Sequence, residues 1–170
     1  MAGKSEALAV QNYIDPIRRA LACVTKAVPQ VGGGYSAANN PHTFTLGAEP
    51  VRLSGKNKIR LSIEQIYEIV ETDDPDRGPW KVHILAYDYA LYDLAGPIAS
   101  YHWHPDGASP VKTPHVHFQK SGVHFPTGRI AIEDIVRFAI QDFGVKPWRR
   151  TWARILADTQ GKFECYRLWG

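Results

Sequence analysis

A short segment with paired histidines constrains this chain more than any other part of its sequence. Residues 101–118 read YHWHPDGASPVKTPHVHF, in which two His-x-His pairs flank ten residues rich in Pro, Gly, Ser and Asp. Residues of those types form turns, because they tolerate or fix unusual backbone angles. Strand-like pairs on either side of such a turn predict a β-hairpin.

The register of this hairpin decides which face each side chain occupies. We expect His104 to face His115 at the base of the turn. Antiparallel partners keep a constant sum of residue numbers, so His102 would then face His117. Because side chains alternate between faces along a strand, all four imidazoles share one face. The other face carries side chains that suit a core, namely Tyr101, Trp103, Val116 and Phe118.

Histidines gathered in this way can do chemistry in their neutral form. At cross-strand spacings of about 4.5 to 5.5 Å between Cβ atoms, protonated imidazoles would repel one another, so some should be neutral near neutral pH. Three interpretations stay open: a site for Zn²⁺ or another divalent metal, metal-free acid and base catalysis on a phosphodiester, and solvated strand histidines. The candidate metal ligands and catalytic residues are therefore the same set, His102, His104, His115 and His117.

The strand before this hairpin is predicted to add phenols to the histidine face. A DLAG turn joins the two, and across it Tyr92 is expected to pair with Pro97. Tyr87 then lies opposite His102 and joins the candidate catalytic residues, with Tyr89 as a weaker candidate. A slip of one residue would move both phenols to the opposite face.

The HFPTGR segment at residues 124–129 is the predicted anion-binding side of the site. It leads into a predicted helix, whose unpaired backbone N–H groups and dipole favour an anion. Arg129 adds a permanently charged fork suited to phosphate, so the candidate substrate-binding residues are His124, Thr127 and Arg129. A competing interpretation stays open, in which Thr127 only caps the helix and Arg129 pairs with Glu133.

Hydrophobic spacing along the chain predicts an α+β fold, in which helices cover one face of an antiparallel β-meander. Apolar residues at helical spacing indicate an N-terminal helical extension over residues 1–30, bent near Pro16. A Gly- and Asn-rich linker follows over residues 31–41. A single α+β domain then fills residues 42–170.

Within the predicted domain, β patterns cover residues 42–71 and 80–92. The SIEQ stretch in the first of these also resembles a capping box and a short helix, but a strand is favoured. Two helices follow the hairpin, at residues 131–143 and 148–158. A last short strand is expected to begin after Gly161.

Composition narrows the class of protein. The net charge of +3 is mildly basic, which permits nucleic acid as a partner without demanding it. There is no apolar run of about 18 residues to span a membrane, and the N-terminus lacks the apolar core of a signal peptide. We therefore expect a cytoplasmic protein. Cys23 and Cys165 lie far apart and are expected to be buried, reduced thiols.

The His-hydrophobe-His triplets HWH and HVH, at residues 102–104 and 115–117, resemble the metal-binding motif of the HUH endonucleases. Members of that family place a nucleophilic tyrosine on a helix downstream. The two helices predicted after the hairpin contain no tyrosine, and Tyr166 falls in the last predicted strand. The resemblance therefore covers the triplets alone.

A longer series, HxWHP, PHVH and HFPTGR followed by IEDIVRFAI, resembles that of small uncharacterised bacterial proteins. It covers about the last two thirds of the chain and is loosely similar to the TumE-like toxins, whose mechanism is unknown. The resemblance implies a bacterial toxin or defence component that acts on nucleic acid, RNA ahead of DNA, and that a cognate antitoxin protein would bind. It implies no catalytic residues.

Together these observations favour a hydrolase, a small phosphodiesterase and among these a nuclease, that uses the clustered histidines. The alternative is a non-enzymatic binding module whose histidines hold a structural zinc or no metal. A missing carboxylate weighs against the enzyme, since only Asp106 lies near the histidines in sequence and it falls in the turn. Four histidines would also suffice to close a tetrahedral structural site.

Overall fold

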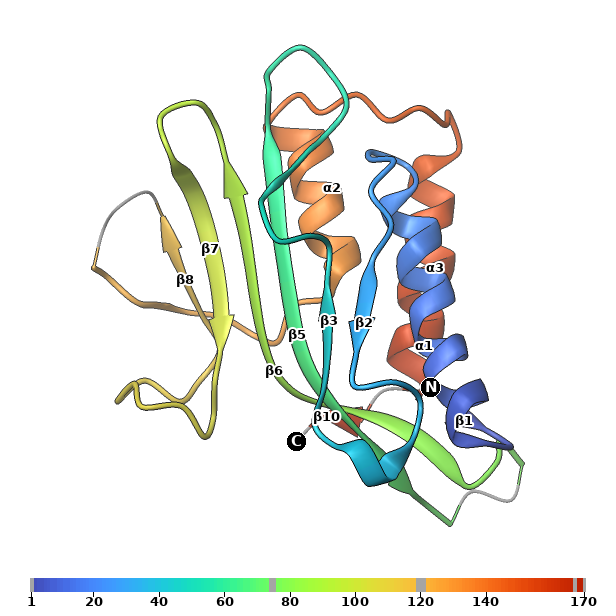
Figure 1. The fold of residues 1–170 in the computed structure, drawn as a ribbon. Coiled ribbons are helices and arrows are strands. Elements are labelled where there is room, and N and C mark those ends of the chain that lie inside the picture. Colours follow the sequence, from blue (N-terminus) through green and yellow to red (C-terminus); the bar gives the residue numbers. More distant parts are fainter. Residues whose placement is uncertain (1, 74–75, 119–121, 167, 170) are drawn as a thin grey trace.

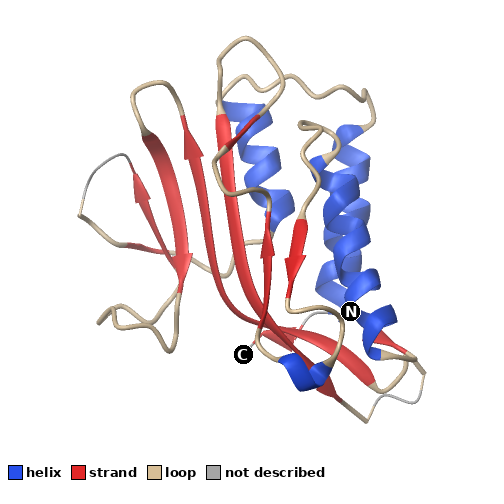
Figure 2. Ribbon diagram, viewed as in Figure 1, coloured by secondary structure: helices blue, strands red, loops and turns tan. Residues whose placement is uncertain are grey.

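Two layers make up the structure, a large sheet and a set of helices on one of its faces (Figure 1). The computed structural model describes residues 2–73, 76–118, 122–166 and 168–169, with the backbone alone from residue 164 onward. The three α-helices lie together on one side of a mostly antiparallel sheet (Figure 2). The predicted α+β architecture is therefore confirmed.

Two long antiparallel strands form the centre of the sheet. β5 (Arg60–Glu71) and β6 (Trp80–Tyr92) pair from end to end. Beyond β5 lie β3 (His42–Thr45) and β2 (Gln30–Gly32), and beyond β6 lie β7 (Pro97–Trp103), β8 (His115–Phe118) and β9 (Phe125–Pro126). Beside this path, β1 (Ala2–Gly3) and β10 (Leu168–Trp169) pair with β6, and β4 (Val51–Arg52) pairs with β5. The strand interpretation of the SIEQ stretch is confirmed.

The helices are α1 (Glu6–Leu21), α2 (Ile132–Asp142) and α3 (Trp152–Tyr166), and a short 3₁₀ turn, η1 (Ala37–Asn39), precedes β3. α2 is followed, after its C-cap Phe143, by a glycine with positive φ, Gly144 at 67°. No helix of the described chain combines the length and apolar character needed to cross a bilayer.

α1 is one continuous helix with Pro16 inside it, so the chain does not divide into two helices at the proline. Ser5 caps its start, with Oγ accepting the N–H of Leu8 at 3.2 Å. A proline inside a helix costs about 3 kcal/mol. Its neighbours Ile14 and Ile17 are 1% and 2% exposed, however. Burial of each such side chain stabilises the fold by about 1.5–3 kcal/mol, which offsets the proline.

α3 continues through Gly161, so the predicted final strand at that point is wrong. Leu156, Thr159 and Phe163 are buried at spacings of three and four residues, which is the helical period. Glycine in a helix costs only about 1 kcal/mol relative to alanine. The packing of these three buried side chains therefore outweighs the low helix propensity of Gly161.

The N-terminal helix belongs to the same hydrophobic core as the sheet and α2. Val10 of α1, Leu61 of β5 and Ile135 of α2 are all part of it. Cys23 is buried in that core, as predicted, and burial raises the pKa of its thiol. The side chain of Cys165 lies outside the described residues. The segment predicted as a linker contributes β2 to the sheet.

Alternation along β5 separates a core face from a polar face. The core-facing residues of this strand are Leu61, Ile63, Gln65, Tyr67 and Ile69. The intervening residues point the other way and include Glu64 and Glu68, whose partners on β6 are Asp88 and His83. We call this face, which lies opposite the helices, the open face.

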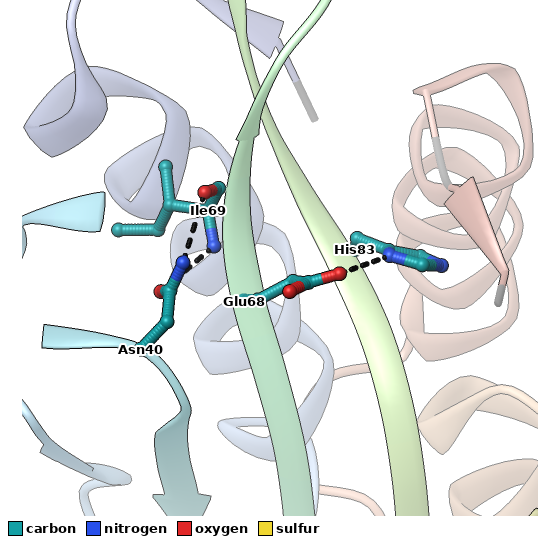
Figure 3. A network of polar contacts seen from close by, with 4 residues as sticks. All are labelled: Asn40, Glu68, Ile69 and His83. Carbon is teal, nitrogen blue, oxygen red and sulfur yellow. Dashed lines mark hydrogen bonds and ion pairs between the residues drawn. The ribbon is translucent and has the colours of Figure 1, made fainter. Parts of the chain in front are cut away.

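Polar side chains support the sheet near the C-terminal end of β5 (Figure 3). Nδ2 of Asn40 donates to the carbonyl of Ile69 at 3.1 Å, and Oδ1 accepts the N–H of the same residue at 3.1 Å. The side-chain amide of Asn40 thereby makes the two hydrogen bonds that a neighbouring strand would otherwise make to Ile69. On the open face nearby, Nδ1 of His83 lies 2.7 Å from Oε1 of Glu68.

Gln65 is the polar centre of the core. It is 1% exposed, accepts a hydrogen bond from the hydroxyl of Tyr13 and donates one to the hydroxyl of Tyr89. A buried hydroxyl that loses its partner destabilises a protein by about 1–3 kcal/mol. One amide therefore satisfies two buried phenols that join α1 to the central strands.

We predict that Gln65→Leu lowers the free energy of unfolding by about 2–4 kcal/mol, because both phenols lose this amide. Urea denaturation of the two proteins measures the difference. A matched control is the triple variant Tyr13→Phe, Gln65→Leu, Tyr89→Phe, which removes the hydroxyls as well and should recover most of the loss. Equal destabilisation of the single and triple variants would contradict the prediction.

Glu133 of α2 is buried although it looks like a surface residue in sequence. It is 1% exposed, and its Oε1 has no hydrogen-bond partner. Burial raises the pKa of this carboxyl from its ordinary value of 4.5, an effect that hydrogen bonds from its own backbone N–H and from the Thr159 side chain offset only in part. The native state therefore binds this proton more tightly than the unfolded chain does.

We predict that Glu133→Gln stabilises the protein at pH 8 and that the gain disappears as the pH falls to about 4. Because the folded-state pKa of Glu133 is raised, its contribution to stability is fully present below pH 4.5 and is lost as the pH rises through the folded-state value. Melting temperatures of both proteins between these pH values test this. A difference independent of pH would show that the carboxyl does not titrate in the fold.

Candidate functional site

Five of the seven histidines gather on the open face, at β7, β8 and β9. The ring centroid of His102 lies 6.0 Å from that of His104, 5.6 Å from His115 and 5.2 Å from His117. The ring of His124, which was predicted to bind an anion, lies 4.8 Å from His115 and 4.4 Å from His117. The prediction that the two His-x-His pairs share one face is confirmed, and a fifth imidazole joins them.

The predicted pairing of the hairpin is wrong by two residues. His102 pairs with His115, and Ser100 pairs with His117. The reason lies at His104, whose carbonyl accepts the N–H of Gly107 at 3.2 Å and so begins the turn. A shift of two residues keeps every side chain on its face, which is why the cluster still forms.

A β-bulge in the β6–β7 hairpin changes which residue of β6 lies beside His102. Tyr92 pairs with Pro97, as expected, but the next partners along the ladder are Leu91 and Ala99. β7 thus contains one extra residue at this point. Residues 87–91 of β6 therefore lie on the faces opposite to those expected from an unbroken hairpin.

Tyr87 therefore does not lie on the histidine face, and its predicted place opposite His102 is wrong. Asp88 takes that place. The ring of Tyr87 is 1% exposed and stacks on Tyr89, with centroids 4.6 Å apart. Its hydroxyl accepts the N–H of Ile130 at 3.3 Å, and burial raises the pKa of the phenol. Tyr87 thus supports the segment that leads into α2.

Asp88 supplies the carboxylate that the sequence near the histidines lacks. Its Oδ2 lies 3.1 Å from Nδ1 of His102, and the two side chains are 41% and 23% exposed. Glu64 of β5 lies directly opposite Asp88, on the same face. The sequence-based prediction missed Asp88 because it assumed that β6 and β7 pair without a bulge. The available signal was an aspartate within the otherwise apolar YDYA stretch.

Among the described residues, two sets of three side chains have ligand atoms close enough to share one metal ion. Within each set, all ligand atoms lie within 4.8 Å of one another. The first set, which we call the three-histidine group, is His115, His117 and His124, and the second, which we call the aspartate group, is Asp88, His102 and His104. In the first, Nδ1 of His115 lies 2.8 Å from the carbonyl of Thr113, which leaves Nε2 as the ligand nitrogen.

The other predicted substrate-binding residues are not members of the two metal-ligand sets. The guanidinium of Arg129 lies over the ring of Trp103, 4.1 Å from its centroid, and Trp103 faces the core. Thr127 does not cap α2, because the N-cap is Ala131, whose N–H donates to Oδ2 of Asp134 at 3.1 Å. The cap half of the competing interpretation is therefore wrong, while the predicted ion pair between Arg129 and Glu133 stays a prediction.

No family model, curated protein or solved structure matches this chain. The resemblances to the HUH endonucleases and to the TumE-like toxins stay predictions. The function is therefore inferred from the site alone.

We predict that Tyr87→Phe lowers the free energy of unfolding by about 1 kcal/mol, because the N–H of Ile130 loses its acceptor. The affinity for Zn²⁺ should not change, since the phenol lies on the core face. Urea denaturation and a calorimetric zinc titration measure the two quantities. A loss of zinc affinity at unchanged stability would place the phenol in the site after all.

Proposed function

We propose that this protein is a metal-dependent phosphodiesterase that cleaves nucleic acid, with RNA as the favoured substrate class. The observation that carries the proposal is the three-histidine group, whose ligand nitrogens converge on an accessible face of the sheet. The proposal is built from three features of that face: the donor set, the neighbouring carboxylate and the absence of a helix above it.

The donor set suits a catalytic divalent ion. Three imidazole ligands are the number found in catalytic zinc sites, which keep one position for water, whereas structural sites are closed by four ligands. The contact between His115 and the Thr113 carbonyl is the kind of outer contact that orients a metal-binding imidazole. A divalent ion bound here lowers the pKa of its water and so supplies hydroxide near neutral pH.

The carboxylate of Asp88 removes the main argument against an enzyme. It lies beside the three-histidine group, because its partner His102 is 5.2 Å from His117 between ring centroids. Hydrolytic sites for phosphate esters need such a group to hold a proton or a metal near the scissile bond.

An open face suits a polymeric substrate. Small-molecule ligands are usually enclosed in a cleft, whereas Asp88 and His102 here keep 41% and 23% of their side chains exposed. Further along the same face, the guanidinium of Arg60 lies 5.7 Å from the ring centroid of Tyr92. A nucleic-acid strand that extends past the histidines would meet this cation and aromatic ring, which suit phosphate and base.

The test is cleavage of a single-stranded RNA oligonucleotide and of bis(p-nitrophenyl) phosphate by protein purified without a His tag and loaded with Zn²⁺. We predict that His117→Ala lowers kcat/KM by at least about 100-fold, because the three-histidine group loses a ligand. Circular dichroism checks that the fold is retained.

The matched control is His83→Ala. His83 is also an imidazole on the open face, but it pairs with Glu68 about 16 Å along β6 from Asp88, at roughly 3.3 Å per residue. Activity of this variant should equal that of the wild type. Zinc binding by the wild type without cleavage of either substrate would reject the enzyme and favour a binding module with a structural zinc.

A further inference from the structure

We infer that Asp88, His102 and His104 bind a second divalent metal ion, so that the open face holds a dinuclear centre. The inference rests on the proposed function, because it takes the three-histidine group as the first metal site. It assigns metal binding to the whole aspartate group, of which the one-metal proposal uses only the Asp88 carboxylate.

The fold brings the aspartate group together from three places. Asp88 on β6 and His102 on β7 are direct partners across the ladder, and His104 follows just after the end of β7. Their ligand atoms lie within 4.8 Å of one another. Two imidazoles and one carboxylate form a donor set that suits Zn²⁺ and other imidazole-binding divalent ions.

The contact between Asp88 and His102 already has the spacing of two ligands on one ion. Ligand atoms about 2.0–2.1 Å from a tetrahedral ion lie about 3.3 Å from each other. Oδ2 of Asp88 and Nδ1 of His102 are 3.1 Å apart. An ion could therefore replace the direct contact with little movement of the backbone.

The two groups are also close enough to act together. The ring of His102 is stacked on that of His115, with centroids 5.6 Å apart, and lies 5.2 Å from that of His117. In two-metal hydrolases the ions lie about 3.5–4 Å apart and together stabilise the attacking and leaving oxygens of a phosphodiester. Rings on adjacent strands at these distances can hold ions as neighbours.

Asp88 and Glu64 supply negative charge for a second cation. They face each other across β5 and β6, and both side chains reach solvent on the open face. The pair formed by His83 and Glu68 provides a comparison, since it has a carboxylate and an imidazole at 2.7 Å. Among the described residues, His83 and Glu68 belong to no set of three ligands.

A different arrangement would use one ion only. His102 would then act as a fourth imidazole that closes the three-histidine group, and Asp88 would only orient it through Nδ1. This arrangement makes no use of His104. The number of ions bound, and the effect of changing His104, therefore distinguish the two arrangements.

The experiment is a count of zinc ions per chain by mass spectrometry of metals, after equilibration with Zn²⁺ and removal of the excess. We expect two ions in the wild type. Either Asp88→Asn or His104→Ala should retain one, and so should His117→Ala, which damages the other group. The control His83→Ala should still bind two. A single ion in the wild type, or two ions in His104→Ala, would overturn the inference.

A spectroscopic measurement separates a second ion from a merely structural role of Asp88. Manganese-loaded wild type should give the paramagnetic resonance signal of a spin-coupled pair, and Asp88→Asn that of an isolated ion. Activity distinguishes this inference from the proposed function. Two ions without cleavage would leave the inference standing and reject the phosphodiesterase, whereas cleavage with one ion would do the reverse.

Discussion

One extra residue in the ladder between β6 and β7 determines what the open face can do. Because β7 accommodates Ile98 without a partner on β6, residues 87–91 of β6 exchange faces. Tyr87 and Tyr89 thereby enter the core, where they contact the segment before α2 and the amide of Gln65. Asp88 emerges beside the histidines. The polar network of the core and the carboxylate of the site depend on the same irregularity.

The histidine face was predictable because alternation along a strand survives an error of an even number of residues. The expected partner of His102 was His117 and the observed partner is His115, yet all of these side chains stay on one face. The bulge was not predictable, since Ile98 is an ordinary strand residue that gives no local signal. An error of one residue in the register of β6 and β7 is enough to place Tyr87 rather than Asp88 opposite His102.

The remaining differences between prediction and structure come from packing between distant parts of the chain. Pro16 predicted a bend and Gly161 the start of a strand, but buried stripes on α1 and α3 keep the helix continuous through each residue. Glu133 has the spacing of a surface ion-pair partner for Arg129, yet α2 turns it into the core. Local preferences therefore predicted the type of most elements, while burial decided where helices end and which charges are hidden.

The histidines lie at the edge of the sheet, and this affects how the site responds to partial unfolding. β8 has four residues and β9 has two, so few ladder hydrogen bonds hold β8 to β7 and β9 to β8. Local opening of such an edge requires less free energy than unfolding of the central strands. The arrangement of His115, His117 and His124 can thus be lost while the core stays intact. A ligand that holds these rings together would slow amide hydrogen exchange at this edge and leave the exchange of β5 and β6 unchanged.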